Sequence, residues 1–332
     1  MKAMLSKQAG GPETLVFDDL PDPKPQAGEV MIAVKACGVN FPDSLIIEDR
    51  YQFKPPRPFA PGGEVAGVVE TVGAGVTAFK PGDRVIGSVI SGGMAEKLCV
   101  EAARCTPMPA NMPFDEASAL ILTYGTSIHA LKDRARLKKG DTLLVLGAAG
   151  GVGVSAVELG KAYGARVVAA VSSEDKLAFV KKIGADSGVV YPRGPFDKAG
   201  SKALADLFKQ ACGEHGADVI YDPVGGDYSE AALRAIAWEG RFLVVGFPAG
   251  IAKLPLNLTL LKSCDVVGVF WGGFARRDPK ANAANIAELM QLYAKGAIKP
   301  MISERYPLKD AGKAIARLAS RQAMGKIVVT MD

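Results

Sequence analysis

Hydrophobic residues follow two different patterns of spacing along this chain, and the pattern changes near Tyr124. Before that point, apolar side chains recur at every second position in residues 29–36, and residues 67–72 and 84–89 are also rich in strand-forming residues. This spacing is typical of strands with one buried face, and the prolines between Pro55 and Pro61 exclude a helix there. The first part of the chain therefore predicts an antiparallel, barrel-like domain.

From Tyr124 on, short and almost fully apolar runs alternate with glycine turns and helical patterns. We expect six parallel strands, over residues 143–146, 166–171, 189–191, 219–222, 242–246 and 266–270, and helices over 154–163, 174–183, 202–212 and 228–238. Such alternation predicts an α/β fold with a doubly wound parallel sheet of the Rossmann type. Two further helices, near 284–294 and 311–320, and a last strand over 327–330 are expected to return to the first domain.

A glycine-dense turn follows the first of these parallel strands. Gly147, Gly150 and Gly153 come directly after the apolar run 143–146 and open the next helical pattern. Bare backbone amides and the positive end of a helix are suited to a pyrophosphate, so the spacing predicts a dinucleotide-binding turn. The strict fingerprint has glycine where this chain has Ala148, which leaves open a glycine-rich turn in some other α/β protein.

The end of the second parallel strand bears on the choice of dinucleotide. An acidic residue about 20 positions after the glycines holds the ribose 2′-hydroxyl when the cofactor is NAD. Here Ser172 and Ser173 occupy that place, and Glu174 and Asp175 follow them. The two acidic residues have an ordinary explanation as the first turn of a helix that a serine caps.

Basic and phenolic side chains lie close to the same corner in the sequence. Lys176 follows the acidic pair, and Tyr191 and Arg193 lie at the end of the third strand. Hydroxyls and cations suit a 2′-phosphate better than a diol, so we expect the cofactor to be NADPH. The alternative is that Lys176 and Arg193 are ordinary solvated surface charges.

Composition narrows the class of protein. A chain of 332 residues is longer than one hydrophobic core ordinarily supports, so we expect two domains, and 48% hydrophobic residues fit a globular protein. The net charge of +5 is spread along the chain, so we expect no nucleic acid partner.

No apolar run is long enough for a membrane span or a signal peptide, which favours a cytoplasmic protein. The five cysteines are odd in number and widely spaced, so neither a disulfide framework nor a zinc knuckle is expected.

Several short motifs together carry a family resemblance over nearly the whole chain. They are the segments 37–43, 61–67, 80–85, 123–126 and 325–326 with the glycine turn, read as CGVNFPD, PGGEVAG, KPGDRV, TYGT and GK. With them the chain resembles the zinc-free quinone oxidoreductases of the medium-chain dehydrogenase/reductase superfamily. The resemblance implies a GroES-like catalytic domain over residues 1–123, completed by 273–332, and a Rossmann NADPH-binding domain over 124–272.

The same resemblance bears on metal and on reaction. Zinc-dependent members carry a cysteine where Asn40 stands and a histidine where Gly63 stands, so no metal is expected here. Without a Lewis acid, a conjugated acceptor is the better substrate, which implies an NADPH-dependent reductase of quinones or α,β-unsaturated carbonyl compounds. Two alternatives stay open: an enoyl-thioester reductase acting on an acyl-CoA or acyl carrier protein, and an NADPH-binding protein with little turnover.

Three residues of the first domain are implied as catalytic. Tyr51 matches a tyrosine assigned to acid or substrate-positioning roles in related enoyl-thioester reductases, although a tyrosine also often packs in a pocket wall. Asn40 would present its amide to the substrate or to the nicotinamide ribose. Asp43 lies in the same motif, with helix capping from about Ser44 as its structural alternative.

The cofactor would contact residues from several segments. Besides Ser172, Ser173, Lys176 and Tyr191, the candidates are Thr126, Ala149, Gly150, Gly151, Val152, Gly246, Phe247, Phe270, Trp271, Arg321 and Lys326. Core packing is the alternative for Phe247 and Trp271, and surface charge is the alternative for Arg321 and Lys326. The last strand of the Rossmann sheet, 266–270, would be an unpaired apolar edge, which favours a homodimer.

Overall fold

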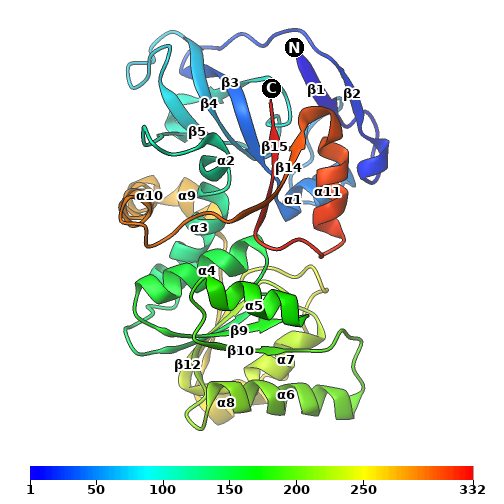
Figure 1. Ribbon diagram of the computed structural model, residues 1–332, viewed down its shortest axis with the longest axis vertical. Helices are drawn as coiled ribbons and strands as arrows, with labels where there is room; N and C mark the ends of the chain where they lie inside the picture. Colours follow the sequence, from blue (N-terminus) through cyan, green and yellow to red (C-terminus); the bar gives the residue numbers. More distant parts are fainter. Residues whose placement is uncertain (332) are drawn as a thin grey trace. The chain divides into compact units, whose positions relative to one another are not determined.

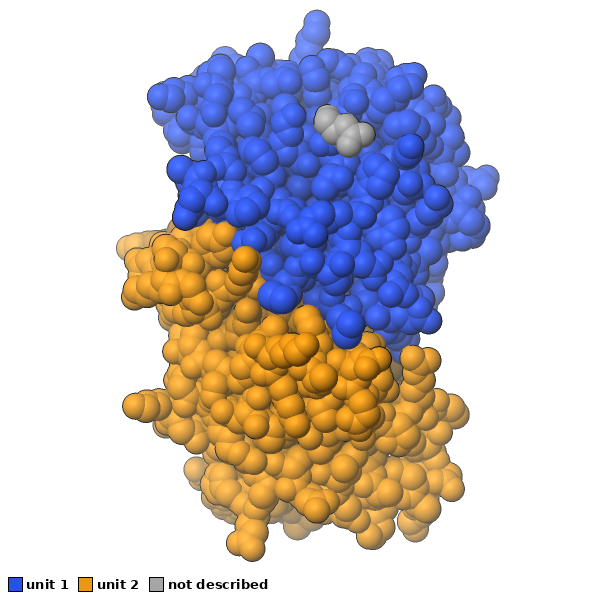
Figure 2. Space-filling view, viewed as in Figure 1, with its two compact units in different colours: residues 1–122, 300–332 blue, residues 123–299 orange. Residues whose placement is uncertain are grey.

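A computed structural model describes residues 1–331 and divides the chain into two compact units. Unit 1 contains Met1–Leu122 and the chain from Pro300 on, and unit 2 is Thr123–Lys299 (Figure 2). Residues 273–299 group with unit 2, although we expected them in the first domain. The reason lies in side chains of helix α10 (Pro279–Ala294), because Asn285 and Glu288 hydrogen-bond to Asp133 and Lys132 of the same unit.

Unit 1 is built mainly from antiparallel strands, as the alternating pattern predicts. Its larger sheet has the order β14-β15-β3-β4-β5-β7, and β6 also pairs with β3. The strands are β1 (Lys2–Leu5), β2 (Val16–Asp19), β3 (Glu29–Gly38), β4 (Glu64–Val72), β5 (Arg84–Ser88), β6 (Lys97–Glu101), β7 (Cys105–Pro107), β14 (Ile302–Pro307) and β15 (Lys326–Thr330). β1 and β2 form a separate two-stranded sheet, and β14 runs parallel to β15.

The helices of unit 1 are short. They are α1 (Phe41–Ile47), α2 (Phe114–Ala117) and α11 (Ala311–Ala319), with single 3-10 turns at Pro12–Thr14, Ala102–Arg104 and Leu308–Asp310. Ile32, Val65 and Ile327 belong to one buried cluster to which α11 contributes Ile315, so the end of the chain completes the core of the first unit. Helix α1 begins at Phe41 and not at Ser44, because Asn40 already has the extended backbone of an N-cap.

Unit 2 holds the six predicted parallel strands in the order β10-β9-β8-β11-β12-β13, and Figure 1 labels β9, β10 and β12 of this sheet. They are β8 (Thr142–Leu146), β9 (Arg166–Val171), β10 (Ser187–Val190), β11 (Ala217–Asp222), β12 (Ile236–Val244) and β13 (Asp265–Gly268). Both faces of the central strands are buried: Leu143 and Leu144 are neighbours on β8, and each is 0% exposed. A sheet buried on both faces explains why these strands are continuous apolar runs.

Helices cover both faces of this sheet. Figure 1 shows α4 and α5 on one face and α6 and α7 on the other. The helices of unit 2 are α4 (Gly151–Ala162), α5 (Glu174–Lys182), α6 (Lys198–Cys212), α7 (Asp227–Leu233), α8 (Asn257–Lys262), α9 (Trp271–Arg277) and α10. Helix α3 (Ile121–Ile128) spans the boundary between the units and continues into a π-helical segment, His129–Arg134. Within residues 1–331, no helix combines the length and the apolar character that a membrane crossing requires.

One predicted helix was wrong in its second half. Residues 228–238 were expected to form a single helix, but α7 ends at Leu233 and Ile236 already begins β12. Ile236 pairs with Ala217 of β11, and both side chains are buried in the sheet core. Pairing with a buried strand therefore outweighs the local helical pattern, and Trp238 lies on the strand with 63% of its surface exposed.

Candidate active site

The predicted glycine turn forms the junction between β8 and α4. Gly147 has φ of +55°, a left-handed backbone that favours glycine. A Cβ at Gly153 would lie 2.3 Å from the carbonyl oxygen of Gly147, so α4 approaches the turn as closely as it does only because residue 153 has no side chain. Ala148, the departure from the strict fingerprint, is fully buried, so its methyl group points into the protein.

The N-terminus of α4 fits a pyrophosphate. Gly150 is the N-cap, and no side chain in the described part of the chain caps this helix. The N–H groups of Gly151 and Val152 lie in the first turn, where a helix leaves its amides without internal partners. Apart from the chain neighbours of Gly150 and the backbone of α4, the one described atom within 4 Å of a Cβ added at Gly150 would be the oxygen of Gly147 at 3.4 Å, so the backbone is open to a ligand there. Ala149, Gly150, Gly151 and Val152 thus lie at this helix start, and their contact with the cofactor stays a prediction.

The expected 2′-phosphate corner follows β9. Ser173 is the N-cap of α5, with its Oγ accepting the Lys176 N–H at 3.4 Å. The ammonium of Lys176 donates to the Oγ of Ser172 at 3.4 Å. Tyr191 lies beside this corner because its N–H donates to the carbonyl of Val171, the last residue of β9. The structure therefore brings Ser172, Ser173 and Lys176 together next to the backbone of Tyr191, whose ring is buried against Phe208 and Tyr228, while Arg193 is exposed.

Glu174 and Asp175 occupy the first turn of α5, as the capping explanation requires. Both are exposed. Negative side chains are favourable at a helix N-terminus, which accounts for them without a role in binding a ribose.

Other expected cofactor residues of unit 2 lie on α3 and after the late strands. Thr126 is half-buried in α3, and the indole of Trp271 packs against the neighbouring Gly125, since a Cβ at Gly125 would lie 2.9 Å from it. Gly246 and Phe247 follow β12, and Phe270 follows β13. Phe247 is 57% exposed and Phe270 is 50% exposed, so neither serves as a core residue in this unit.

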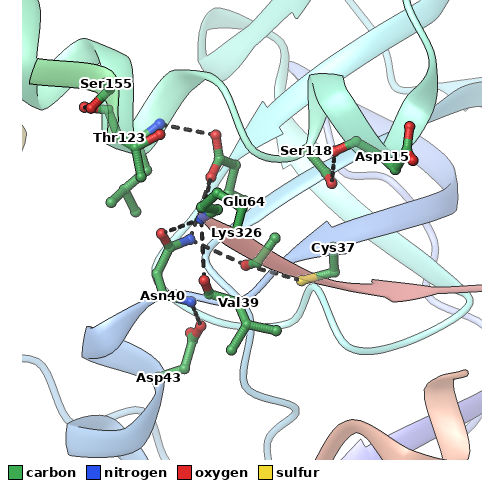
Figure 3. A network of polar contacts seen from close by, with 12 residues as sticks. Cys37, Val39, Asn40, Asp43, Glu64, Asp115, Ser118, Thr123, Ser155 and Lys326 are labelled. Atoms are coloured by element: carbon green, nitrogen blue, oxygen red, sulfur yellow. Dashed lines mark hydrogen bonds and ion pairs between the residues drawn. The ribbon is translucent and has the colours of Figure 1, made fainter. Parts of the chain in front are cut away.

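A buried polar cluster lies in unit 1, where β3, β4 and β15 meet (Figure 3). The ammonium of Lys326 donates to the Oδ1 of Asn40 at 2.7 Å and to the carbonyl of Val39 at 3.1 Å. It also lies 3.9 Å from the Oε2 of Glu64. Asp43 accepts the N–H of Asn40 at 2.7 Å and the N–H of Gly62 at 3.1 Å, so it supports the start of α1 from inside the helix.

Burial shifts the pKa values of the charged members of this cluster. Loss of solvent raises the pKa of Asp43 to about 6 and raises the pKa of Glu64, and it lowers the pKa of Lys326. The attraction between Lys326 and the two carboxylates opposes all three shifts. A buried ammonium is retained here because two carboxylates and an amide oxygen surround it.

The contacts of Asn40 bear on its expected role. Its amide nitrogen donates to the carbonyl of Gly38 at 3.1 Å and to Glu64 at 3.3 Å, and its oxygen accepts from Lys326. Both amide hydrogens therefore have partners inside unit 1, and the residue is 5% exposed. Sequence reasoning missed Glu64, although a carboxylate inside the otherwise apolar strand pattern of residues 64–69 was a usable signal.

Tyr51 lies on the loop after α1 and is half-buried against the core of unit 1. Burial raises the pKa of its phenol, so the group stays protonated and able to donate at neutral pH. Arg57 holds this loop, since it donates to the carbonyl of Ile47 at 3.0 Å and pairs with Asp49 at 2.9 Å. Arg321 also belongs to unit 1, where its φ is +59°.

Asn40 and Gly63 stand where zinc-dependent members carry a cysteine and a histidine, so neither zinc ligand is present here. Within residues 1–331, no group of three or more histidine, cysteine, aspartate or glutamate side chains is arranged to hold a metal ion.

Both units are similar to known protein families. Residues 26–110 match the family model "Alcohol dehydrogenase GroES-like domain", and residues 151–291 match the model "Zinc-binding dehydrogenase". The rat protein named quinone oxidoreductase-like protein 2 is 36% identical over 91% of this chain and 85% of its own length.

Two solved structures extend the likeness to the whole fold. A mycobacterial protein complexed with NADPH is 31% identical, with a TM-score of 0.91 and 99% coverage of both chains. The Escherichia coli quinone oxidoreductase complexed with NADPH is 29% identical, with a TM-score of 0.88, over 99% of this chain and 100% of that one. The chain therefore belongs to the quinone oxidoreductases of the medium-chain dehydrogenase/reductase superfamily.

Proposed function

We propose that this protein is an NADPH-dependent reductase that transfers hydride to quinones or α,β-unsaturated carbonyl compounds without a metal. The observation that carries the proposal is the corner formed by Ser172, Ser173 and Lys176 at the end of β9, next to the glycine turn. Two hydroxyls and an ammonium match a 2′-phosphate. Both NADPH complexes named above come from relatives that share this fold over nearly the whole chain.

Metal independence is supported by what surrounds Asn40, the residue that stands where zinc-dependent members carry a cysteine ligand. Asn40 and Glu64 already hold the ammonium of Lys326, which is itself a positive charge at 2.7 Å from the Asn40 oxygen. A metal cation bound to the same oxygens would be repelled by that ammonium in a site without solvent screening. Lys326 therefore competes with any metal for these ligands.

The roles of the residues follow from their chemistry. NADPH, when bound, supplies the hydride that adds to the electron-poor carbon of the acceptor. The chain contributes binding of the cofactor phosphates at α4 and at Lys176, and Tyr51 donates a hydrogen bond to the acceptor oxygen on which negative charge develops. Asp43 and Asn40 fix the start of α1, and this helix ends at Ile47, four residues before Tyr51.

A bulky thioester substrate is less well supported. The phosphates of an acyl-CoA need free basic side chains, for which the candidates are Arg50, Lys54, Arg57, Arg276 and Arg277. Of these, Arg50 pairs with Glu48 at 2.9 Å and Arg57 pairs with Asp49. These two arginines are therefore partly neutralised within unit 1. Free enones and quinones should be better acceptors than crotonyl-CoA.

The proposed function is tested by following NADPH oxidation with 9,10-phenanthrenequinone, an alkyl enone and crotonyl-CoA, with and without a chelator and with NADH in parallel. We expect chelator-insensitive turnover that prefers NADPH and is fastest with the quinone or the enone. Loss of activity with the chelator would contradict metal independence. Saturation at micromolar crotonyl-CoA with poor enone turnover would replace the proposed substrate class.

The role of Tyr51 has its own test. Tyr51→Phe should lower turnover with enones by about 10- to 100-fold and leave NADPH affinity nearly unchanged, because the phenol acts mainly in the transition state. Tyr306→Phe is the matched control in the same unit, since within residues 1–331 its hydroxyl donates to the nearby Glu304 at 2.7 Å and to no other side chain. Unchanged turnover in Tyr51→Phe would remove this residue from the mechanism.

A further inference from the structure

A set of buried hydroxyls joins α3 to α4 and β11 inside unit 2. The Oγ of Ser127 lies 2.8 Å from the Oγ of Ser155 and 2.8 Å from the hydroxyl of Tyr221. Ser127 also donates to the carbonyl of Val152, and Ser155 donates to the carbonyl of Thr123 at 3.1 Å. Ser127, Ser155 and Tyr221 are all 0% exposed.

A carboxylate extends this contact along the two helices. The hydroxyl of Tyr124 donates to the Oε2 of Glu158 at 2.5 Å, and both groups are buried. Val152, Ser155 and Glu158 are three residues apart and so share one face of α4. We call the contacts made by Thr123, Tyr124 and Ser127 with these three residues and Tyr221 the α3–α4 polar seam.

Holding two helices together does not require buried polar groups. Burying a hydroxyl is unfavourable unless it is hydrogen-bonded, and apolar side chains would hold two helices together at lower cost. What a fully paired network adds is direction, because hydrogen bonds require particular distances and angles that apolar contacts do not. The seam therefore fixes α3 relative to α4 more narrowly than apolar contacts would.

The two fixed segments are the ones expected to hold opposite ends of the nicotinamide mononucleotide half of the cofactor. Thr126, the residue expected beside the nicotinamide, lies on α3 between Tyr124 and Ser127. Val152, whose carbonyl accepts from Ser127, lies in the first turn of α4 that is expected to bind the pyrophosphate. The seam and the binding residues are thus neighbours in both helices.

We infer that Ser127, Ser155, Tyr221 and Glu158 are positioning residues, which set the place of the nicotinamide relative to the pyrophosphate. This inference rests on the proposed function, because it assigns the α3 and α4 segments to NADPH. None of the four side chains needs to touch the cofactor. They act through Thr126 and through the backbone of the glycine turn.

The test compares Tyr221→Phe and Ser155→Ala with Tyr163→Phe. The control removes a tyrosine hydroxyl that bonds to Glu288 at 2.8 Å in the same unit, outside the seam. Three quantities are measured for each variant: the affinity for 2′,5′-ADP, which lacks the nicotinamide; the fluorescence anisotropy of bound NADPH; and the rate of hydride transfer in a single turnover.

We expect both seam variants to bind 2′,5′-ADP as the wild type does, within about twofold. Hydride transfer should slow by about 5- to 10-fold, the effect of one lost hydrogen bond, and the bound nicotinamide should show lower anisotropy. The control should match the wild type in all three measurements. Ser155→Ala and Tyr221→Phe remove different partners of Ser127, so the failure of one variant to fold leaves the other as the test.

Two results would overturn the inference. The first is that the seam variants match the control in all three measurements. The second is that they lose 2′,5′-ADP affinity to the same extent as the rate of hydride transfer, because the seam would then have a structural role alone. A wild type that binds NADPH but reduces no acceptor would contradict the proposed function instead. In that case the anisotropy of bound NADPH still decides whether the seam orders the nicotinamide.

Discussion

Replacing Lys326 by methionine is the most direct test of the buried cluster in unit 1. Methionine has a similar length but no charge and no donor, so Glu64 and Asp43 would keep their burial and lose their only nearby cation among the described contacts. At 3.9 Å and an effective dielectric constant of about 20, the pair Lys326–Glu64 is worth about 4 kcal/mol before desolvation. Breaking one partner of a buried pair typically costs about 3 to 5 kcal/mol, which agrees with that figure.

The second variant separates charge from packing. Lys326→Met combined with Glu64→Gln removes both charges of this pair and leaves only Asp43 without its cation, so we expect it to recover part of the lost stability, because a neutral buried pair carries little desolvation penalty. Lys35→Met is the matched control, since Lys35 is an exposed residue of the neighbouring strand β3 and should change stability by less than about 0.5 kcal/mol.

Urea unfolding followed by two signals gives the measurement. Both tryptophans of the chain, Trp238 and Trp271, belong to unit 2, so their fluorescence follows that unit, while far-UV circular dichroism follows both. In Lys326→Met the dichroism should begin to fall at lower urea than the fluorescence does. A loss below about 1 kcal/mol, or a double variant no more stable than the single one, would refute the reasoning.

Three further outcomes can be measured independently. Lys176→Ala should weaken NADPH binding by about 1 to 2 kcal/mol and leave NADH binding unchanged, and equal losses for both would contradict the 2′-phosphate corner. Burial raises the pKa of Glu158 from 4.5 to about 7, so the folded state holds this proton more tightly than the unfolded chain does. The free energy of unfolding should therefore fall as the pH rises from 4.5 through 7, by up to about 3 kcal/mol relative to Glu158→Gln, as measured by urea titrations. If the free energies of the two proteins change in parallel with pH, this prediction is wrong. Among the described strands, β13 lies at the sheet edge and pairs with β12 alone, and Val266 there is 41% exposed. We therefore expect a homodimer that Val266→Lys shifts toward monomer in sedimentation, and a monomeric wild type would contradict this expectation.

Local patterns explain which parts of the fold were predictable. The glycine turn and the strands of unit 2 are encoded within short segments, because a parallel strand buried on both faces must be apolar throughout. The helix expected over 228–238 failed because its second half is decided by pairing with Ala217, which no local window contains. The boundary at residue 299 likewise depends on Asn285 and Glu288 contacting residues more than a hundred positions earlier.

The candidate site shows the same division. Ser172, Ser173 and Lys176 lie within five positions, so their grouping could be inferred from the sequence. Lys326 was expected near the cofactor, while its described partners, Asn40, Val39 and Glu64, come from the other end of the chain. A lysine near the end of a sequence has no local mark that distinguishes a surface charge from a fully buried one.

The discontinuity of unit 1 gives the order in which the nascent protein can fold. Domains generally fold as units during synthesis, and unit 2 is one continuous stretch of chain whose synthesis is complete before β14 and β15 are made. Until β15 is translated, β3 lacks one neighbour and the acidic residues around Asn40 lack their cation. The nucleotide-binding unit is thus expected to mature first, and the last strand to emerge completes the unit that began synthesis.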